Sequence, residues 1–273
     1  MSYPQLLTGK TGIISGALDE TSIAWQVALK AHAAGAKFIL TNAPVALRMG
    51  KINALAEQTG SQVLAADATS LEDIEKLYDA AAEQYGKIDF LLHSIGMSLN
   101  VRKGRAYTDL NYDWLQKTYD ISAVSFHKML QTAWKREAFN KGGSVVALSY
   151  IAAQRAFPKY DDMTEAKALL ESIARTFGDY FGRRDGVRIN TVSQSPTPTT
   201  AGSGIAGFSK MLQYGEMMSP LGNASAEECA DFVITLFSDL TRKITMQNIM
   251  HDGGFSSVGL SENVLNLLPD PDA

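Results

Sequence analysis

The chain has 273 residues, of which 45% are hydrophobic and 20% are charged, a balance typical of a folded protein and not of a disordered or fibrous one. Its formal net charge of −4 gives no basic surface for nucleic acid or an anionic membrane, so we expect neither as a partner. Cys229 is the only cysteine, which excludes an internal disulfide and favours a reduced core residue. No secretory leader pattern or long apolar run is present, and we expect a cytoplasmic protein.

Short β-rich runs alternate with helical patterns along most of the chain. The predicted strands cover residues 12–15, 37–41, 62–66, 88–94, 144–149, 187–192 and 248–251. The predicted helices cover residues 22–34, 46–58, 71–85, 112–139, 158–181 and 226–238. This order predicts an α/β fold: a single doubly wound Rossmann domain over residues 1–273, with a seven-stranded parallel sheet and helices on both faces.

Two longer segments interrupt this alternation. Residues 98–111 are polar, and residues 195–220 combine three prolines with glycines and apolar side chains. Long irregular segments in compact domains often serve as lids or binding loops. Both segments directly follow strands, and ligands of doubly wound sheets bind outside the carboxyl ends of the strands. We therefore expect both to wall the binding crevice, with a substrate lid near residues 195–220.

The turn after the first strand carries few glycines. Only Gly16 remains of a dinucleotide fingerprint, and Ser22 and Ile23 stand where the next helix begins. Backbone N–H groups, a hydroxyl and the positive end of a helix dipole suit an anion there. An ordinary helix cap explains the same residues, and the turn alone leaves both interpretations open.

Asp67 and Ala68 follow the third strand. The Asp67 carboxylate suits an adenine amino group, or else it caps the turn that follows. The second strand ends without the acid that pairs with a ribose diol, and Arg48 is at least as well explained as a solvated surface charge. The choice between NADH and NADPH stays open at this point.

Tyr160 and Lys167 are spaced as Tyr-x6-Lys, just after Pro158. Pro158 predicts a helix start, and seven residues make almost two helical turns, so both side chains should lie on nearly one face, about 10 Å apart along the axis. A nearby ammonium favours the charged form of a phenol. The spacing alone is common, and its significance depends on the rest of the chain.

The combined pattern resembles the short-chain dehydrogenase/reductase superfamily, and within it the NADH-dependent enoyl-acyl-carrier-protein reductases of bacterial fatty-acid synthesis. Most of the superfamily carries Tyr-x3-Lys, which this chain lacks, whereas the enoyl reductase branch has Gly-x5-Ser-Ile-Ala and Tyr-x6-Lys. The matching segments are Gly16, Ser22–Ile23–Ala24, His93–Ser94–Ile95–Gly96, Leu148–Ser149–Tyr150, Tyr160, Lys167, Arg188–Ile189–Asn190, Ser203–Gly204–Ile205 and Asp252–Gly253–Gly254.

This resemblance implies reduction of a trans-2-enoyl thioester on acyl carrier protein by NADH, with NADPH not excluded, in a homotetramer. Tyr160 would stabilise the enolate, Lys167 would hold the nicotinamide ribose, and Tyr150 is either a second catalytic candidate or a buried aromatic residue. The implied cofactor residues are Gly16, Ser22, Ile23, Asp67, Ala68, Ser94, Ile95, Gly96, Lys167, Thr197 and Thr199. The implied substrate residues are Ser98, Met163, Ile205 and Phe208, and Met211 and Met218 would join them in the acyl channel.

Several residues favour a structural interpretation. We expect Asp161 and Asp162 to face solvent at a helix N-terminus, and His93 to be a core histidine. The four histidines are scattered, so we predict no metal site. Two other functions stay open: a 3-oxoacyl or other carbonyl reductase of the same superfamily, and an inactive nucleotide-binding protein.

Overall fold

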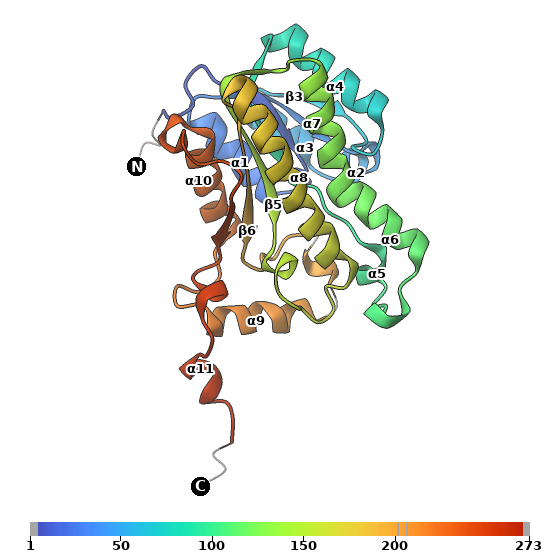
Figure 1. The fold of residues 1–273 in the computed structure, drawn as a ribbon, viewed down its shortest axis with the longest axis vertical. Coiled ribbons are helices and arrows are strands. Elements are labelled where there is room, and N and C mark those ends of the chain that lie inside the picture. The colour runs from blue at the N-terminus through green and yellow to red at the C-terminus, as the bar shows by residue number, and fades with distance from the viewer. Residues whose placement is uncertain (1–4, 201, 206, 270–273) are drawn as a thin grey trace.

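Seven parallel strands form one sheet in the computed structural model, which describes residues 5–200, 202–205 and 207–269 (Figure 1). The strand order is β3-β2-β1-β4-β5-β6-β7, which confirms the predicted doubly wound Rossmann fold. The strands are β1 (Thr11–Ser15), β2 (Lys37–Asn42), β3 (Gln62–Ala65), β4 (Ile88–His93), β5 (Phe139–Ser149), β6 (Arg188–Gln194) and β7 (Asn248–His251).

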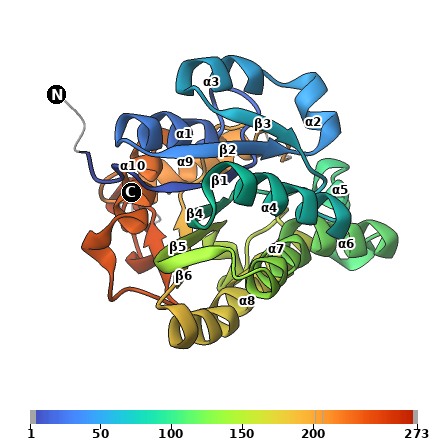
Figure 2. The same cartoon turned by 90° about the horizontal axis from the view of Figure 1, so that it is seen from above.

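Helices pack on both faces of the sheet (Figure 2). One face is covered by α1 (Ile23–Ala33), α3 (Ile52–Thr59) and α10 (Ala226–Phe237), and the other by α4 (Leu71–Tyr85), α7 (Ser125–Lys135) and α8 (Asp162–Asp185). Ile13 and Ile14 of β1 are both fully buried and belong to opposite hydrophobic clusters. Consecutive strand residues are apolar because both faces of the sheet are covered.

Five further helices lie outside these two layers or at their edges. They are α2 (Pro44–Met49), α5 (Leu99–Arg102), α6 (Tyr112–Tyr119), α9 (Phe208–Met218) and α11 (Glu262–Leu265). In Figure 1, α9 and α11 lie beyond the end of the sheet from which β6 leaves. Among the described residues, none of the helices has the length and apolarity that crossing a bilayer requires.

The single helix predicted over residues 46–58 is wrong. The chain forms α2 and α3 instead, separated at Gly50 and Lys51. The backbone of Lys51 donates to the Leu18 carbonyl at 2.8 Å, and a Cβ on Gly50 would lie 2.5 Å from that same oxygen. This close approach to the turn after β1 breaks the helix.

The helix predicted over residues 112–139 is also too long. A π-helical turn at Asp120–Val124 joins α6 to α7, and α7 ends at Lys135. Glu137 then adopts φ 48°, which a helix cannot continue, and Phe139 begins β5 as a buried residue. The apolar periodicity of the sequence does not reveal where the helix ends, because Phe139 fits a helical face as well as a strand.

The prediction that Pro158 starts a helix is wrong as well, since α8 begins at Asp162. Lys159 and Asp161 have φ of 66° and 40°, so the residues around Tyr160 form a turn. Tyr160 therefore precedes the helix that carries Lys167, and the two side chains do not share a helical face. The helix continues to Asp185 and ends at the left-handed Gly186.

The two segments predicted to be irregular contain regular structure. Residues 98–111 include α5, and residues 195–220 include the eleven-residue α9. Ala201 and Ala206 of the predicted lid lie outside the described residues. Helix α9 follows the positive-φ Gly207, which explains how a glycine-containing segment still forms a helix.

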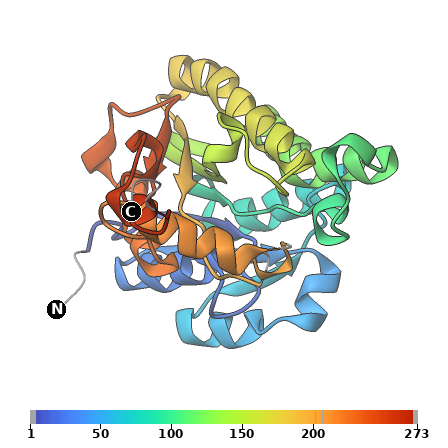
Figure 3. The ribbon, with the colours of Figure 1, turned by 90° about the horizontal axis from the view of Figure 1, so that it is seen from below.

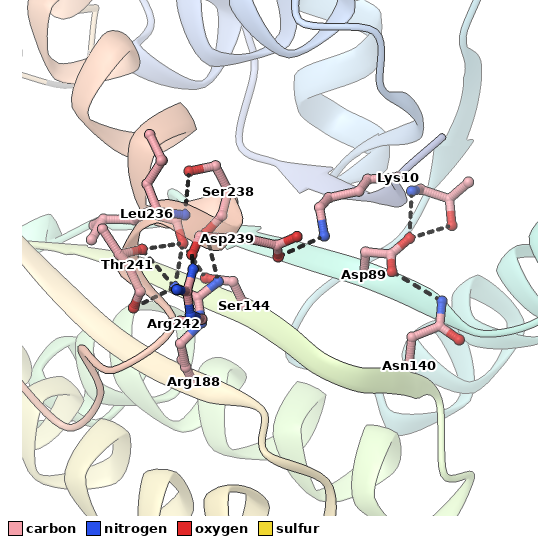
Figure 4. A network of polar contacts seen from close by, with 12 residues as sticks. Lys10, Asp89, Asn140, Ser144, Arg188, Leu236, Ser238, Asp239, Thr241 and Arg242 are labelled. Atoms are coloured by element: carbon pink, nitrogen blue, oxygen red, sulfur yellow. Dashed lines mark hydrogen bonds and ion pairs between the residues drawn. The ribbon is translucent and has the colours of Figure 1, made fainter. Parts of the chain in front are cut away.

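A buried arginine connects β6 to the segment after α10 (Figure 4). Arg188 donates to the carbonyls of Leu236 at 2.7 Å and Ser238 at 3.1 Å, and to the Thr241 hydroxyl at 2.7 Å. Ser144 of β5 donates to the same Leu236 oxygen at 2.8 Å. Buried main-chain carbonyls at a helix end need such donors. This network therefore fixes the end of α10 against the sheet.

Candidate active site

A cavity of about 220 Å³ opens at the carboxyl ends of β4, β5 and β6. Helix α9 crosses this end of the molecule (Figure 3). The structure brings most of the predicted site residues together there: Ile23, Ser94, Ile95, Gly96, Ser98, Tyr150, Tyr160, Met163, Lys167, Thr197, Thr199, Ile205, Phe208 and Met211. The predicted residues outside its lining are Gly16, Ser22, Asp67, Ala68 and Met218.

Tyr160 lies in the wall of this cavity with 9% of its surface exposed. Burial raises the pKa of its phenol, since the ionised form is poorly solvated there. This is the opposite of the lowering expected from a neighbouring ammonium, and burial is its cause. The phenol is thus protonated at neutral pH and available as a hydrogen-bond donor.

Lys167 is buried in the first half of α8 and faces the same cavity. Its Nζ donates to the Leu148 carbonyl at the end of β5, at 2.7 Å. Burial lowers the pKa of Lys167 to about 8, and the Glu171 carboxylate opposes that shift. An ammonium has three donors, so two remain for a ligand after the bond to Leu148.

Tyr150 follows β5 and its ring packs at a tilt of 56° against Tyr160, with ring centroids 5.0 Å apart. Its hydroxyl donates to the Met211 sulfur of α9 at 3.6 Å, and burial raises the pKa of its phenol. Tyr150 is therefore both a buried aromatic residue and a member of the cavity wall. It links the strand end to the lid helix.

The turn after β1 is held by its own polar groups. Ser22 Oγ accepts from the backbone N–H groups of Leu18 and Asp19, both at 3.2 Å. Gly16 has φ 97°, and a Cβ there would lie 2.0 Å from the Ser94 carbonyl. The turn after β1 therefore packs directly against the segment after β4, which only glycine permits.

The backbone at Gly96 forms a cradle beside Lys167. A Cβ on Gly96 would come within 3.4 Å of Met163 Cε and 3.7 Å of Lys167 Nζ. Small residues that let a ligand approach the main chain are what a dinucleotide needs. Together with the free donors of Lys167, this space fits the ribose and nicotinamide end of a dinucleotide cofactor.

Asp67 makes the structural contacts of a turn. Its Oδ1 accepts from the N–H of Thr69 at 2.9 Å and from the Thr69 hydroxyl at 2.8 Å. The residue is exposed, and Ala68 beside it is half-buried. These contacts show that Asp67 caps the turn. Adenine recognition by Asp67 stays a prediction.

His93 is a core residue, as predicted. The ring is fully buried at the end of β4, and Nε2 lies 2.9 Å from the Ser125 hydroxyl. Burial and the charge of Lys167 lower its pKa to about 3. His93 is therefore neutral at physiological pH. Cys229 is buried too, as expected.

The segment predicted to form a lid is attached to the turn after β1. Thr200 donates to Asp19 Oδ2 at 2.5 Å through its hydroxyl, and its N–H donates to Thr21 Oγ1 at 3.3 Å. These bonds join the segment that follows β6 to the turn near Ile23, which lines the cavity.

Asp162 corrects one expectation, and Ser98 is its partner. Asp162 is completely buried and does not face solvent. It accepts a hydrogen bond from the Ser98 hydroxyl at 2.6 Å, so this hydroxyl is already engaged within the protein although Ser98 lines the cavity. Asp161, its neighbour, is half-buried.

Sequence reasoning missed several residues of the cavity wall. Val101 and Arg102 come from α5, Gln194 ends β6 and Ser195 follows it, and Met97 follows β4. All stand at strand ends or in the segments predicted to wall the crevice, and that position is the signal that identifies them. Within the described ranges, no three His, Cys, Asp or Glu side chains gather as a metal-ligand set.

These features can be compared with known proteins. The family model described as "Enoyl-(Acyl carrier protein) reductase" matches residues 16–256. The chain belongs to this family. The match covers the turn after β1, the Tyr160 turn, α8 and the lid, and it confirms the resemblance drawn from the sequence.

Curated and solved members of the family are similar over nearly their whole length. Enoyl-[acyl-carrier-protein] reductase [NADH] 1 of Rhizobium meliloti is 35% identical over 257 residues, covering 93% of each chain. FabI of Escherichia coli is 32% identical over 259 residues, covering 94% of this chain and 97% of the relative. The crystal structure of the FabI–NADH complex from Alistipes finegoldii is 61% identical with a TM-score of 0.95, covering 98% of this chain and 95% of the other.

Proposed function

We propose that this enoyl reductase family member reduces the trans-2 double bond of an enoyl thioester carried on acyl carrier protein, with NADH as reductant. The observation that carries the proposal is the meeting of the protonated Tyr160 phenol and the Lys167 ammonium in one cavity. The relatives named above are NADH-dependent enoyl reductases by name, which supports both substrate and cofactor.

Tyr160 would stabilise the charge that develops on the substrate. Reduction at the β-carbon moves negative charge to the thioester oxygen as an enolate. The buried phenol donates a hydrogen bond to that oxygen, and its raised pKa keeps the proton on Tyr160 at neutral pH. Tyr150 and Met163 are buried beside Tyr160 and would exclude solvent from the reacting atoms.

Lys167, Gly96 and the turn after β1 would hold the cofactor. When bound, NADH supplies the hydride that saturates the β-carbon. Lys167 would bind the ribose hydroxyls with the two donors left after its bond to Leu148. Gly96 would leave room for the nicotinamide, and Thr197 and Thr199 would close over it from the lid side.

We also propose the arrangement around this site. Residues 1–273 would act as one domain, residues 195–220 as its substrate lid, acyl carrier protein as the partner and a homotetramer as the assembly. The exposed face of α9 and the apolar Ile205 and Phe208 support an acyl channel under the lid.

The decisive assay compares two thioesters with the same chain length. Crotonyl thioester tests double-bond reduction, and acetoacetyl thioester tests carbonyl reduction, each followed by loss of NADH or NADPH absorbance. We expect turnover of the crotonyl substrate with NADH. A protein that consumed only the acetoacetyl substrate would be a carbonyl reductase, and one that bound NADH without turnover would be an inactive nucleotide-binding protein.

A further inference from the structure

Asp162 is a fully buried carboxylate two residues after Tyr160. Its Oδ1 accepts from the Ser98 hydroxyl at 2.6 Å. Its Oδ2 accepts from the Asn100 amide at 2.8 Å and from the Thr118 hydroxyl at 2.9 Å. Three donors satisfy one buried charge, and hydrogen bonds to a carboxylate are stronger than neutral ones.

The three donors come from the segment that follows β4. Ser98 follows β4, caps α5 and lines the cavity, and Asn100 lies within α5. Thr118 comes from the last turn of α6. Asp162 therefore joins the start of α8 to the segment of residues 98–119, in which Ser98, Val101 and Arg102 line the cavity, and its neighbour Met163 lines the same cavity.

The turn that carries Tyr160 needs such an anchor. Lys159 and Asp161, on either side of Tyr160, have φ of 66° and 40°. Positive φ at residues other than glycine persists only where the surrounding structure holds it in place. On the helix side of the turn, the first side chain with buried partners is Asp162.

Glu165, one turn further along α8, contacts the same wall. Its carboxylate accepts from the hydroxyls of Tyr107 and Tyr119. The contact with Tyr107 is exposed and the one with Tyr119 is partly buried, whereas the contact of Asp162 with Ser98 is buried. The buried contacts are the ones adjacent to the cavity, so Asp162 carries the larger share of the connection.

We propose that Asp162 is a positioning residue, which holds the strained Tyr160 turn against the substrate wall at Ser98 and so fixes the phenol where the thioester oxygen must lie. This inference rests on the proposed function. Asp162 does not line the cavity itself, and it acts through Tyr160 and Ser98.

The test is a double-mutant cycle between Asp162→Asn and Tyr160→Phe, read as kcat with crotonyl thioester and NADH. Asn keeps the size of the side chain but loses its charge. We expect Asp162→Asn to lower kcat roughly tenfold or more in the wild-type background, because small displacements of a reacting group cost that much. In the Tyr160→Phe background it should lower kcat by less than about twofold, because the phenol that it positions is absent.

Asp161→Asn is the matched control, since its half-buried carboxylate is one residue away and outside this cluster. Its kcat should equal that of wild type. If Asp162→Asn fails to fold, as judged by thermal unfolding, Ser98→Ala removes one of the three bonds and enters the same cycle. Equal losses of kcat in both backgrounds would overturn the role assigned to Asp162. The proposed function would still stand, because the wild type would be active. A wild type unable to reduce crotonyl thioester would overturn the proposed function, and the assignment with it.

Discussion

The Lys167 ammonium donates a 2.7 Å hydrogen bond to the Leu148 carbonyl, which anchors it at the end of β5. Replacing Lys167 with Met should remove the donors expected to hold the cofactor ribose. Hydrogen bonds to charged groups contribute about 1.5–3 kcal/mol, so the Kd for NADH should rise roughly ten- to hundredfold. Fluorescence titration of NADH measures this. The exposed Lys135→Met serves as control, and an unchanged Kd for Lys167→Met would exclude the assigned role.

NADH binding should weaken as the pH rises above about 8, because the pKa of Lys167 lies near that value and its neutral form lacks the charge. The groups beside Lys167 do not titrate in this range: His93 is neutral and Tyr160 is protonated. A titration of Kd against pH checks this prediction. Constant affinity from pH 7 to pH 10 would contradict it.

The contribution of Lys167 to the free energy of unfolding should rise with pH, whereas NADH affinity should fall. Its folded-state pKa of about 8 is lower than the ordinary lysine value of 10.5. Between these values the unfolded chain binds more protons at this group, so its contribution to the free energy of unfolding rises with pH. Wild type should therefore gain stability relative to Lys167→Met across that window in chemical unfolding. A constant difference between the two would argue against a buried ammonium.

Glu171→Gln should lower the pH at which NADH binding begins to weaken. The buried Glu171 carboxylate opposes the lowering of the Lys167 pKa, and Ser149 donates to it at 2.7 Å. Gln keeps the acceptor for Ser149 but removes the charge. The same pH titration measures the shift, with the exposed Glu57→Gln as control. If NADH binding weakened at the same pH in both proteins, Glu171 would have no electrostatic effect on Lys167.

Gly96→Ala should impair NADH binding without unfolding the protein. The added Cβ would lie 3.4 Å from Met163 Cε and 3.7 Å from Lys167 Nζ, which is ordinary contact distance inside the cradle. Thermal unfolding should stay close to wild type, while the Kd for NADH rises. Gly259→Ala is the control, since nothing lies within 4 Å of its Cβ. Full NADH affinity in Gly96→Ala would show that the cofactor lies elsewhere.

The sheet and most of its helices could be predicted because their signals are local and repeated. Strands such as Ile88–His93 are mostly apolar, and the helix predicted over residues 71–85 has the observed bounds. The cavity also followed from the order of strands, since residues after parallel strands meet at one edge.

The turn around Tyr160 could not be predicted in this way. Its conformation combines positive φ at Lys159 and Asp161 with the burial of Asp162, whose hydrogen-bond partners lie far away in the sequence, in residues 98–118. Pro158 signals a helix start locally, but tertiary contacts delay that start to Asp162. The raised pKa of Tyr160 likewise reflects burial, which spacing does not reveal.

The most direct test of the account is kcat for NADH oxidation with crotonyl thioester, compared between wild type and Tyr160→Phe. Loss of one donor to a developing oxyanion costs about 3–4 kcal/mol, so kcat should fall roughly a hundred- to a thousandfold. The Kd for NADH should stay the same, since Phe keeps the buried ring. A Tyr160→Phe variant as active as wild type would remove the phenol from the mechanism.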